Sequence, residues 1–408
     1  MMPVSKLALA SRCLLLAALF SAPGMIYSQT PGVRLRAINP AGGSGVPRAV
    51  VVEEGALVHT ALMFPEDREG RLQGAGDAGA QAARVLTNME AALHEARTTL
   101  DNLVRLHIYV ADASVTPRID SVLAERFGRA GKMPAVTLVE SEMAVAGMLV
   151  AMDGIAATGW STPGGATRLP SAALRSRTAG ASHVSIQPPG PFVIVSGRAA
   201  PGDFDVAIRD TIAQLRGDLA TAGVTLDHVV QIKSFLGDMR RAQRLEELIA
   251  TSFGGSRVPP QVLTEWRQAS APAEIELIAS AGPPADGRPR VEHVEPILGR
   301  YSRIARVNGG QPIFMSGLYG ESADPVAQVG EMFADLQRVL QAAGSDIRHL
   351  VKATYYVSDA GADARINTIR PSIYVPEHPP AASKLFVRGT GRPGKASTFD
   401  MIAVTTAR

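Results

Sequence analysis

The sequence contains almost no cysteine. The single cysteine among its 408 residues is Cys13, which lies within the first 28 residues. If that segment is removed on export, the mature chain has no thiol. Such a chain cannot form a disulfide, a thiolate nucleophile or a cysteine-ligated metal site, so these classes of site are excluded.

Long hydrophobic runs are also missing from the N-terminal segment. Its apolar run covers only residues 13–20, whereas a membrane-spanning helix needs about 20 apolar residues. Lys6 and Arg12 precede the run, and small residues lead to a candidate cleavage point after Ser28. This order is typical of a secretory signal peptide. We therefore predict that residues 1–28 are a signal peptide and that the mature protein is periplasmic or secreted, with no membrane association.

Charge of one sign does not dominate. The chain has 41 Lys and Arg against 38 Asp and Glu, with no basic block, which predicts no nucleic-acid partner. The sequence has no glycine-rich phosphate loop and no nucleophile elbow. Its histidines lack the spacing of metal ligands. We therefore expect neither a metal nor a cofactor.

The dominant feature is a stretch that occurs three times, at residues 103–112, 229–238 and 350–359. Each copy is an apolar, β-branched and aromatic run that ends on aspartate: Asp112, Asp238 and Asp359. The alternation predicts a strand, and the aspartate predicts the turn or helix cap that follows it.

The flanks of this stretch repeat as well. A helical pattern precedes each copy, and in two copies it ends on a glycine suited to a helix C-cap, Gly223 and Gly344. A final strand carries an acid in each repeat, with spacings of 123 residues (153 to 276) and 124 residues (276 to 400): Asp153, Glu276 and Asp400. This is a threefold internal duplication, and we place the repeats at residues 45–160, 178–282 and 290–408.

Each repeat is expected to run β-β-α-β-α-β-β. In the first repeat, residues 49–52 and 57–61 are expected to pair as a hairpin. Helices are expected near residues 80–96, 119–127, 204–222, 241–252, 325–343 and 364–374. Two helices cannot cover both faces of a sheet, so we expect neighbouring repeats to cover the other face.

The third repeat resembles the Rid family, the YjgF-like reactive intermediate deaminases that act on enamines and imines. The resemblance covers nearly all of residues 298–405. The second repeat is similar but weaker, and the first is weakest, with Thr60-Ala61 in place of a Ser-Gly pair. The elements that match in the third repeat are Tyr301-Ser302, residues 314–317, residues 340–344, Val351-Lys352, Asp359, Asn367, Pro380-Ala381 and residues 399–403.

The resemblance implies a chorismate-mutase-like α+β fold. Family members are homotrimers with a ligand cleft at each subunit interface. Three fused copies would form an intramolecular pseudo-trimer in a monomeric chain, with the sheets facing inward and the helices outside.

The chain departs from the family at one position. The family's deaminases carry an arginine after Pro-Ala, whose guanidinium forks onto the substrate carboxylate. Here the position is Val136, Gln261 or Ala382. Lys384 and Arg388 are on the same strand face as Ala382 by alternation and could supply charge instead. A lysine would do so as a point charge, and a solvated surface role is the alternative for Lys384.

The candidate catalytic residues are Asp400 and Glu276. They align with the family acid that is thought to position or activate water, because a carboxylate can take a proton from water and pass it to leaving ammonia. An interface ion pair or strand-end acid is the alternative, and we prefer that alternative for Asp153.

The candidate substrate-binding residues are Tyr301, Ser316, Gly317, Asn367, Lys384 and Arg388. Tyr301 aligns with a cleft-lining tyrosine, or is simply an aromatic at a strand start. Ser316 and Gly317 could meet a ligand carboxylate or form a turn, and Asn367 could reach the cleft or face solvent.

These observations favour hydrolytic deamination of a small enamine or imine in an inter-repeat cleft. The alternative is a non-catalytic protein, either a scaffold or a binder of a small metabolite such as an imine, enamine or 2-keto acid. Ribonuclease activity, reported for some relatives of the family, is a remote third, because no histidine pair or basic groove supports it.

Overall fold

The computed structural model describes residues 25–26, 30–38, 45–128, 132–161, 166–283, 286–297 and 299–407. The predicted signal peptide lies outside these residues, apart from residues 25–26. Among the described residues, no helix combines the length and apolar character needed to cross a membrane.

The chain contains three units of the expected β-β-α-β-α-β-β order. The first unit comprises β3 (Ala49–Glu54), β4 (Ala56–Thr60), α1 (Ala78–Glu95), β5 (Leu103–Val110), α2 (Thr116–Phe127), β6 (Ala135–Glu140) and β7 (Val150–Thr158). The second comprises β9 (Val184–Gln187), β10 (Phe192–Arg198), α3 (Phe204–Thr221), β11 (Val229–Leu236), α4 (Ala242–Ser252), β12 (Gln261–Glu265) and β13 (Ala273–Ser280). The third comprises β15 (Tyr301–Val307), β16 (Pro312–Met315), α5 (Pro325–Ala343), β17 (Leu350–Val357), α6 (Ala360–Ile373), β18 (Ala381–Phe386) and β19 (Ser397–Val404).

Four further strands lie outside these units: β1 (Met25–Ile26), β2 (Arg34–Ile38), β8 (Thr167–Leu169) and β14 (Val291–Ile297). β2 pairs with β3, β8 with β9, and β14 with β15. They extend the sheets of the repeats.

The repeated aspartates cap helices as the sequence predicts. Asp112 and Asp238 accept hydrogen bonds from the backbone N–H of Ser114 and Arg240 at the start of short 3-10 turns. Asp359 accepts one from Ala362 N–H and begins α6 directly. Each cap satisfies a backbone donor that would otherwise lack a partner, so it fixes where the strand turns into the outer helix.

The first strand of each repeat pairs with the preceding repeat. β9 pairs with β4, β15 with β10, and β3 with β16, so the exchange closes into a ring. The expected hairpin between residues 49–52 and 57–61 is therefore wrong: β3 pairs with β2 and β16, while β4 pairs with β7 and β9. The sequence pattern identified both strands but could not show which edge each strand joins.

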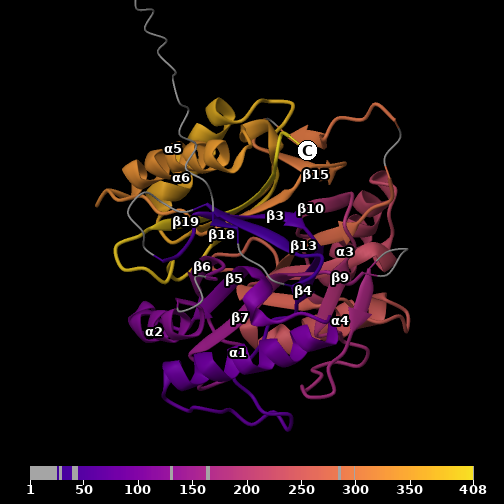
Figure 1. Cartoon of the computed structure of the whole chain (residues 1–408), viewed down its shortest axis with the longest axis vertical. Coiled ribbons are helices and arrows are strands. Elements are labelled where there is room, and N and C mark those ends of the chain that lie inside the picture. Colours follow the sequence, from indigo (N-terminus) through magenta and orange to yellow (C-terminus); the bar gives the residue numbers. More distant parts are fainter. Residues whose placement is uncertain are drawn as a thin grey trace, which may run out of the picture.

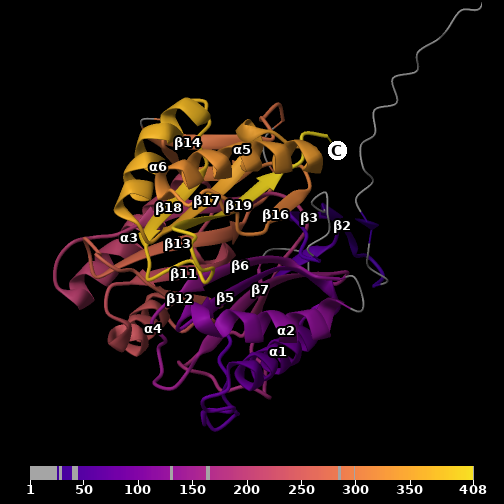
Figure 2. The same cartoon turned by 90° about the vertical axis from the view of Figure 1, so that its left-hand side faces the viewer.

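The helices lie on the outside and the sheets face inward (Figures 1 and 2). Helices α1 and α2, α3 and α4, and α5 and α6 pack in pairs on the sheet of their own repeat. The inner faces meet in one buried apolar cluster to which all three repeats contribute, for example Val104, Ile194 and Phe314. Neighbouring repeats therefore cover the second face of each sheet, as expected for a pseudo-trimer.

Candidate ligand-binding cleft

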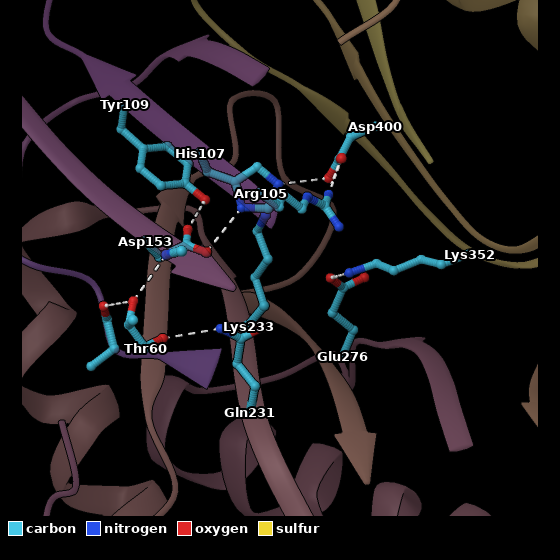
Figure 3. A network of polar contacts seen from close by, with 12 residues as sticks. Thr60, Arg105, His107, Tyr109, Asp153, Gln231, Lys233, Glu276, Lys352 and Asp400 are labelled. Atoms are coloured by element: carbon cyan, nitrogen blue, oxygen red, sulfur yellow. Dashed lines mark hydrogen bonds and ion pairs between the residues drawn. The ribbon is translucent and has the colours of Figure 1, made fainter. Parts of the chain in front are cut away.

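A second set of inward-facing side chains is polar. Alternation along β5, β11 and β17 turns every second residue toward the middle of the molecule. The acid of each repeat lies opposite one of these residues in the antiparallel register: Asp153 opposite His107, Glu276 opposite Lys233, and Asp400 opposite Thr354. The threefold duplication therefore gathers three carboxylates at the centre (Figure 3).

His107 joins two of these acids. Its Nδ1 lies 2.9 Å from Asp153 Oδ2 and its Nε2 lies 2.9 Å from Asp400 Oδ2. Both ring nitrogens face carboxylate oxygens, and a neutral imidazole can donate to only one of them. Burial, together with the Arg105 charge, lowers the pKa of His107. Arg105 also forms an ion pair with Asp400, and Tyr109 Oη donates to Asp153 Oδ1 over 2.8 Å.

The third acid is paired in the same way. Lys352 forms an ion pair with Glu276, and Ser383 Oγ donates to Glu276 Oε2 over 2.9 Å. Lys233 Nζ donates to Tyr356 Oη over 2.6 Å. The network therefore holds three carboxylates and the three cations Arg105, Lys233 and Lys352, all buried.

Burial and this pairing set the protonation of the network. Burial opposes ionisation of Asp153, but His107 and Lys233 outweigh it and hold the pKa of Asp153 well below its usual range. Burial, with repulsion from Lys352, lowers the pKa of Lys233 to about 7. Each acid is ion-paired and shielded from solvent, so the network joins the repeats.

The predicted catalytic and binding residues fall in different environments. Asp400 and Glu276 lie in the central network. Lys384 lies on the opposite face of β18 from Ser383 and pairs with Asp363 of α6. The structure therefore does not bring Lys384 and Asp400 together.

Ser316 and Gly317 lie at the junction of repeats 3 and 1. Ser316 Oγ donates to Pro47 O over 2.6 Å and accepts from Val136 N–H over 3.0 Å, while Gly317 N–H donates to Val136 O over 2.9 Å. These bonds use both functions of the hydroxyl. Ser316 therefore holds two repeats together at the position where the family arginine is missing.

The other three candidates are also engaged within the protein. Asn367 Nδ2 donates to Asp363 Oδ2 over 3.3 Å, and Asn367 Oδ1 accepts from Arg370 over 2.9 Å. The ring of Tyr301, which is partly buried, lies 5.5 Å from the Arg303 guanidinium. Arg388 pairs with Glu265 and with Glu142, and so ties repeat 3 to repeats 2 and 1.

The junction of repeats 1 and 2 contains a cavity of about 70 Å³. This cavity, with its lining residues, is called the 1/2 cleft below. Its walls come from the end of β4 and the loop after it, from α1, from the segment before β9, and from α4 and β12. The polar and charged lining residues include Glu66, Asn88, Arg175, Arg177, Ser182, His183, Glu246 and Gln261.

Two carboxylates and two guanidinium groups face one another in the 1/2 cleft. Arg177 Nε lies 3.2 and 3.3 Å from the two carboxylate oxygens of Glu246. Arg175 Nη1 lies 3.7 Å from Glu66 Oε2, a looser pair. Burial raises the pKa of both Glu66 and Glu246, and the arginines oppose this effect. Buried carboxylates with raised pKa values beside a cavity are typical of a functional site.

The backbone around Glu66 is fixed from α1. Asn88 Nδ2 donates to Phe64 O over 2.8 Å and to Glu66 O over 2.9 Å. Arg84 Nε also donates to Glu66 O, over 3.1 Å. The loop that carries the carboxylate is therefore held in place, as a reactive group requires.

His183 fixes the segment that carries the arginines. Its Nδ1 accepts from Ser171 N–H over 2.8 Å, and its Nε2 donates to Arg175 O over 3.1 Å. This arrangement requires a neutral ring with its proton on Nε2. Burial lowers the pKa of His183, which keeps the ring neutral near pH 7.

Sequence reasoning missed most of this cleft. Glu66 and Glu246 are not among the candidate residues predicted from the sequence, and Arg175 and Arg177 lie between the first two predicted repeats. The available signal was the pair of arginines ahead of β9, whose aligned positions in the third repeat are Glu295 and Ile297. In the described part of the chain, no group of three or more His, Cys, Asp or Glu side chains is placed to hold a metal ion.

Comparison with known proteins gives one consistent result. The family model described as Endoribonuclease L-PSP matches residues 47–158, 177–281 and 293–395. Protein DfrA of Myxococcus xanthus is 32% identical over 116 residues, which cover 26% of this chain and 87% of that protein. A RutC family protein of Pyrococcus abyssi is 29% identical over 110 residues, which cover 27% of this chain and 85% of that protein.

Solved structures match in the same way. A YjgF family member from Mycobacterium tuberculosis is 30% identical, with a TM-score of 0.22, and the match covers 30% of this chain and 99% of that chain. A YjgF family member from Neisseria meningitidis is 26% identical, with a TM-score of 0.23, and the match covers 29% of this chain and 97% of that chain.

Proposed function

Because the chain belongs to the Endoribonuclease L-PSP family, the YjgF or Rid family, and carries the family unit three times, we propose that it hydrolyses a small imine or enamine in the 1/2 cleft. One observation carries the proposal. Glu66 is a buried carboxylate with a raised pKa that lines a cavity, and its ion pair with Arg175 is a loose one of 3.7 Å.

The reaction needs one group that moves protons. Glu66 accepts a proton from the water that adds to the carbon of the C=N bond. It then donates that proton to the nitrogen, which gives an intermediate with a hydroxyl and an amino group on the same carbon. Glu66 next carries the remaining hydroxyl proton to the nitrogen, so that the C–N bond breaks, ammonia leaves and the carbonyl forms. An enamine first takes a proton on carbon to become the imine. A raised pKa suits both halves of this cycle, because a carboxylate with a higher pKa is a stronger base and keeps its proton more readily until it donates it.

Asp400 and Glu276 have a different part in this proposal. They serve assembly of the three repeats, because each is buried and held by a cation. Glu246 makes two contacts with Arg177 and orients that guanidinium.

Ligand binding without turnover is the second candidate function. It is favoured by a specific observation: the acids that align with the family acid, Asp153, Glu276 and Asp400, all lie in the central network and none lines the 1/2 cleft. In this alternative the cleft binds an imine, an enamine or a 2-keto acid and releases it unchanged.

An ammonia-release assay on the full mature chain tests the proposal. The imine substrate is generated in the assay by an amino-acid oxidase, and no cofactor is added for the chain itself. Ala181→Trp should fill the cleft and abolish the acceleration, whereas Ala327→Trp, on the exposed surface of α5, should leave it unchanged. If wild type releases no extra ammonia but binds the 2-keto acid, the binding function takes its place. If it does neither, both are wrong.

We also propose that the chain is exported and acts as a monomer. The repeats already cover one another's inner faces as three subunits would, and residues 1–28 have the pattern of a signal peptide. A sedimentation coefficient of a larger assembly, or retention of the chain in the cytoplasmic fraction, would contradict these proposals.

A further inference from the structure

The 1/2 cleft lacks the cation that its relatives use for a carboxylate. Gln261 occupies the position where the family resemblance expects arginine, and its carboxamide is neutral. Its Oε1 is buried and makes no hydrogen bond within the described part of the chain. Burying a ligand carboxylate without a cationic partner costs several kcal/mol, so a carboxylate ligand needs another cation here.

The segment before β9 brings two cations to this place. Arg177 lies with its guanidinium carbon 4.7 Å from the ring centre of Phe64 in repeat 1, while its Nε contacts Glu246 in repeat 2. Its side chain is 22% exposed, compared with 47% for Arg175. Arg177 is therefore held between the repeats at the wall of the cavity.

The wall of the cleft also carries a smaller side chain than the matching position of the third repeat. Ala181 lies sixteen residues before Gly197, and Tyr301 lies sixteen residues before Gly317. The small side chain of Ala181 thus occupies the position of a tyrosine in the third repeat. The next residue, Ser182, is 3% exposed and lines the cavity, and its Oγ makes no hydrogen bond to any described residue. A buried hydroxyl of this kind is available to a ligand.

We propose that Arg177, supported by Arg175, is the carboxylate anchor of the 1/2 cleft, so that the segment before β9 supplies the positive charge that β12 lacks. This proposal rests on the proposed function of the cleft as a ligand site. Arg177 can present two parallel N–H donors to a carboxylate, because Phe64 and Glu246 hold its plane in place.

The charge balance then indicates the class of ligand. The cleft holds two guanidinium groups and two carboxylates, which balance when all four are ionised. A simple anion such as a 2-keto acid would leave one negative charge in excess, unless Glu66 or Glu246 took up a proton. A molecule with one carboxylate and one protonated nitrogen keeps the balance. The preferred ligand is therefore a small 2-imino or 2-amino acid, with its carboxylate on Arg177 and its nitrogen toward Glu66.

Calorimetric titration of the full mature chain near pH 7 tests the anchor with three probes. These are L-2-aminobutyrate, which has both charges, 2-oxobutanoate, which is only an anion, and L-2-aminobutyramide, which has no carboxylate. We expect wild type to bind L-2-aminobutyrate more tightly than 2-oxobutanoate. Arg177→Gln should weaken L-2-aminobutyrate binding about tenfold or more, since a charge-assisted hydrogen bond contributes about 1.5–3 kcal/mol, and should leave the amide within about twofold.

Two further variants serve as controls for this test. Arg177→Gln leaves Glu246 buried without its cation and could disturb folding, so the double variant Arg177→Gln/Glu246→Gln removes both charges together. The matched control is Arg240→Gln, whose side chain is 85% exposed and pairs with Asp238 away from the cleft. The control should bind all probes as wild type does.

The outcomes separate the anchor from the proposed function. Undiminished L-2-aminobutyrate binding in both Arg177 variants would overturn the anchor while the cleft remained a ligand site. Tighter binding of 2-oxobutanoate than of L-2-aminobutyrate by wild type would overturn the charge-balanced ligand class. If wild type bound none of the three probes, the proposed function of the cleft would fall together with the anchor.

Discussion

His107 in the first repeat and Asp400 in the third lie 293 positions apart in the sequence, and His107 Nε2 lies 2.9 Å from Asp400 Oδ2. The same imidazole contacts Asp153 in its own repeat through Nδ1. A single side chain therefore links the first and third repeats at the centre of the molecule. The contacts there are shielded from water and depend on one another.

Replacement of His107 by leucine should destabilise the whole chain. It leaves Asp153 and Asp400 with one partner fewer in a buried site, and breaking a buried charged network costs about 3–5 kcal/mol. Denaturant unfolding followed by circular dichroism measures the loss. His94→Leu is the matched control, because that side chain is 63% exposed, and it should change the free energy of unfolding by less than about 0.5 kcal/mol. Equal stability of the two variants would show that the network does not hold the repeats together.

Ser316→Ala should lower stability without changing ligand binding. The hydroxyl donates to Pro47 O and accepts from Val136 N–H, so its loss leaves two backbone groups of repeat 1 without that partner. We expect a cost of about 1–3 kcal/mol in the free energy of unfolding. Ser372→Ala, on the exposed face of α6, should have little effect. A variant that keeps wild-type stability but loses affinity for L-2-aminobutyrate would instead place Ser316 in a ligand site.

The segment that carries Arg175 and Arg177 should respond to pH through His183. The ring is neutral when it accepts from Ser171 N–H, and protonation of Nδ1 removes that bond. Burial lowers the pKa of His183 in the folded chain, while the unfolded value is about 6.5. The folded state therefore binds fewer protons in the window below pH about 6.5. Stability rises with pH through this window, and below it the segment loosens.

Nuclear magnetic resonance of the Ser171 amide follows this change. The amide signal should titrate with a midpoint below pH 6.5 in wild type and should not titrate there in His183→Leu. A midpoint at or above 6.5 would contradict the neutral, buried ring.

Much of the fold could be predicted because it depends on local patterns. α3 and α5 begin at Phe204 and Pro325 as predicted, since apolar periodicity and a preceding aspartate or proline act within a few residues. α6 begins at Ala360 rather than at residue 364, because Asp359 caps it without an intervening turn. Gly344 takes a φ of 82° at the C-cap of α5, as its position predicts.

The arrangement of the strands and the site could not be predicted in this way. Whether β3 pairs with β4 or with β16 depends on how complete repeats pack, and alternation is the same in both cases. Likewise Glu66, Arg177 and Glu246 come from three separate segments whose contact depends on the position of α4 against the loop after β4. Alignment of the repeats also predicted that the family acid and the position of the missing arginine share one cleft. In the structure the acids face the centre of the molecule instead.

Comparison of two glutamates tests the central claim most directly, namely that the 1/2 cleft and not the central network carries the chemistry. Ammonia release should be measured for wild type, Glu66→Gln and Glu276→Gln, with unfolding curves for each variant. We predict that Glu66→Gln lowers kcat by about 100-fold or more with a normal unfolding transition. Glu276→Gln should lower stability, because Lys352 loses its partner, while the folded fraction keeps its kcat. Full activity in Glu66→Gln, or loss of kcat in folded Glu276→Gln, would contradict the account.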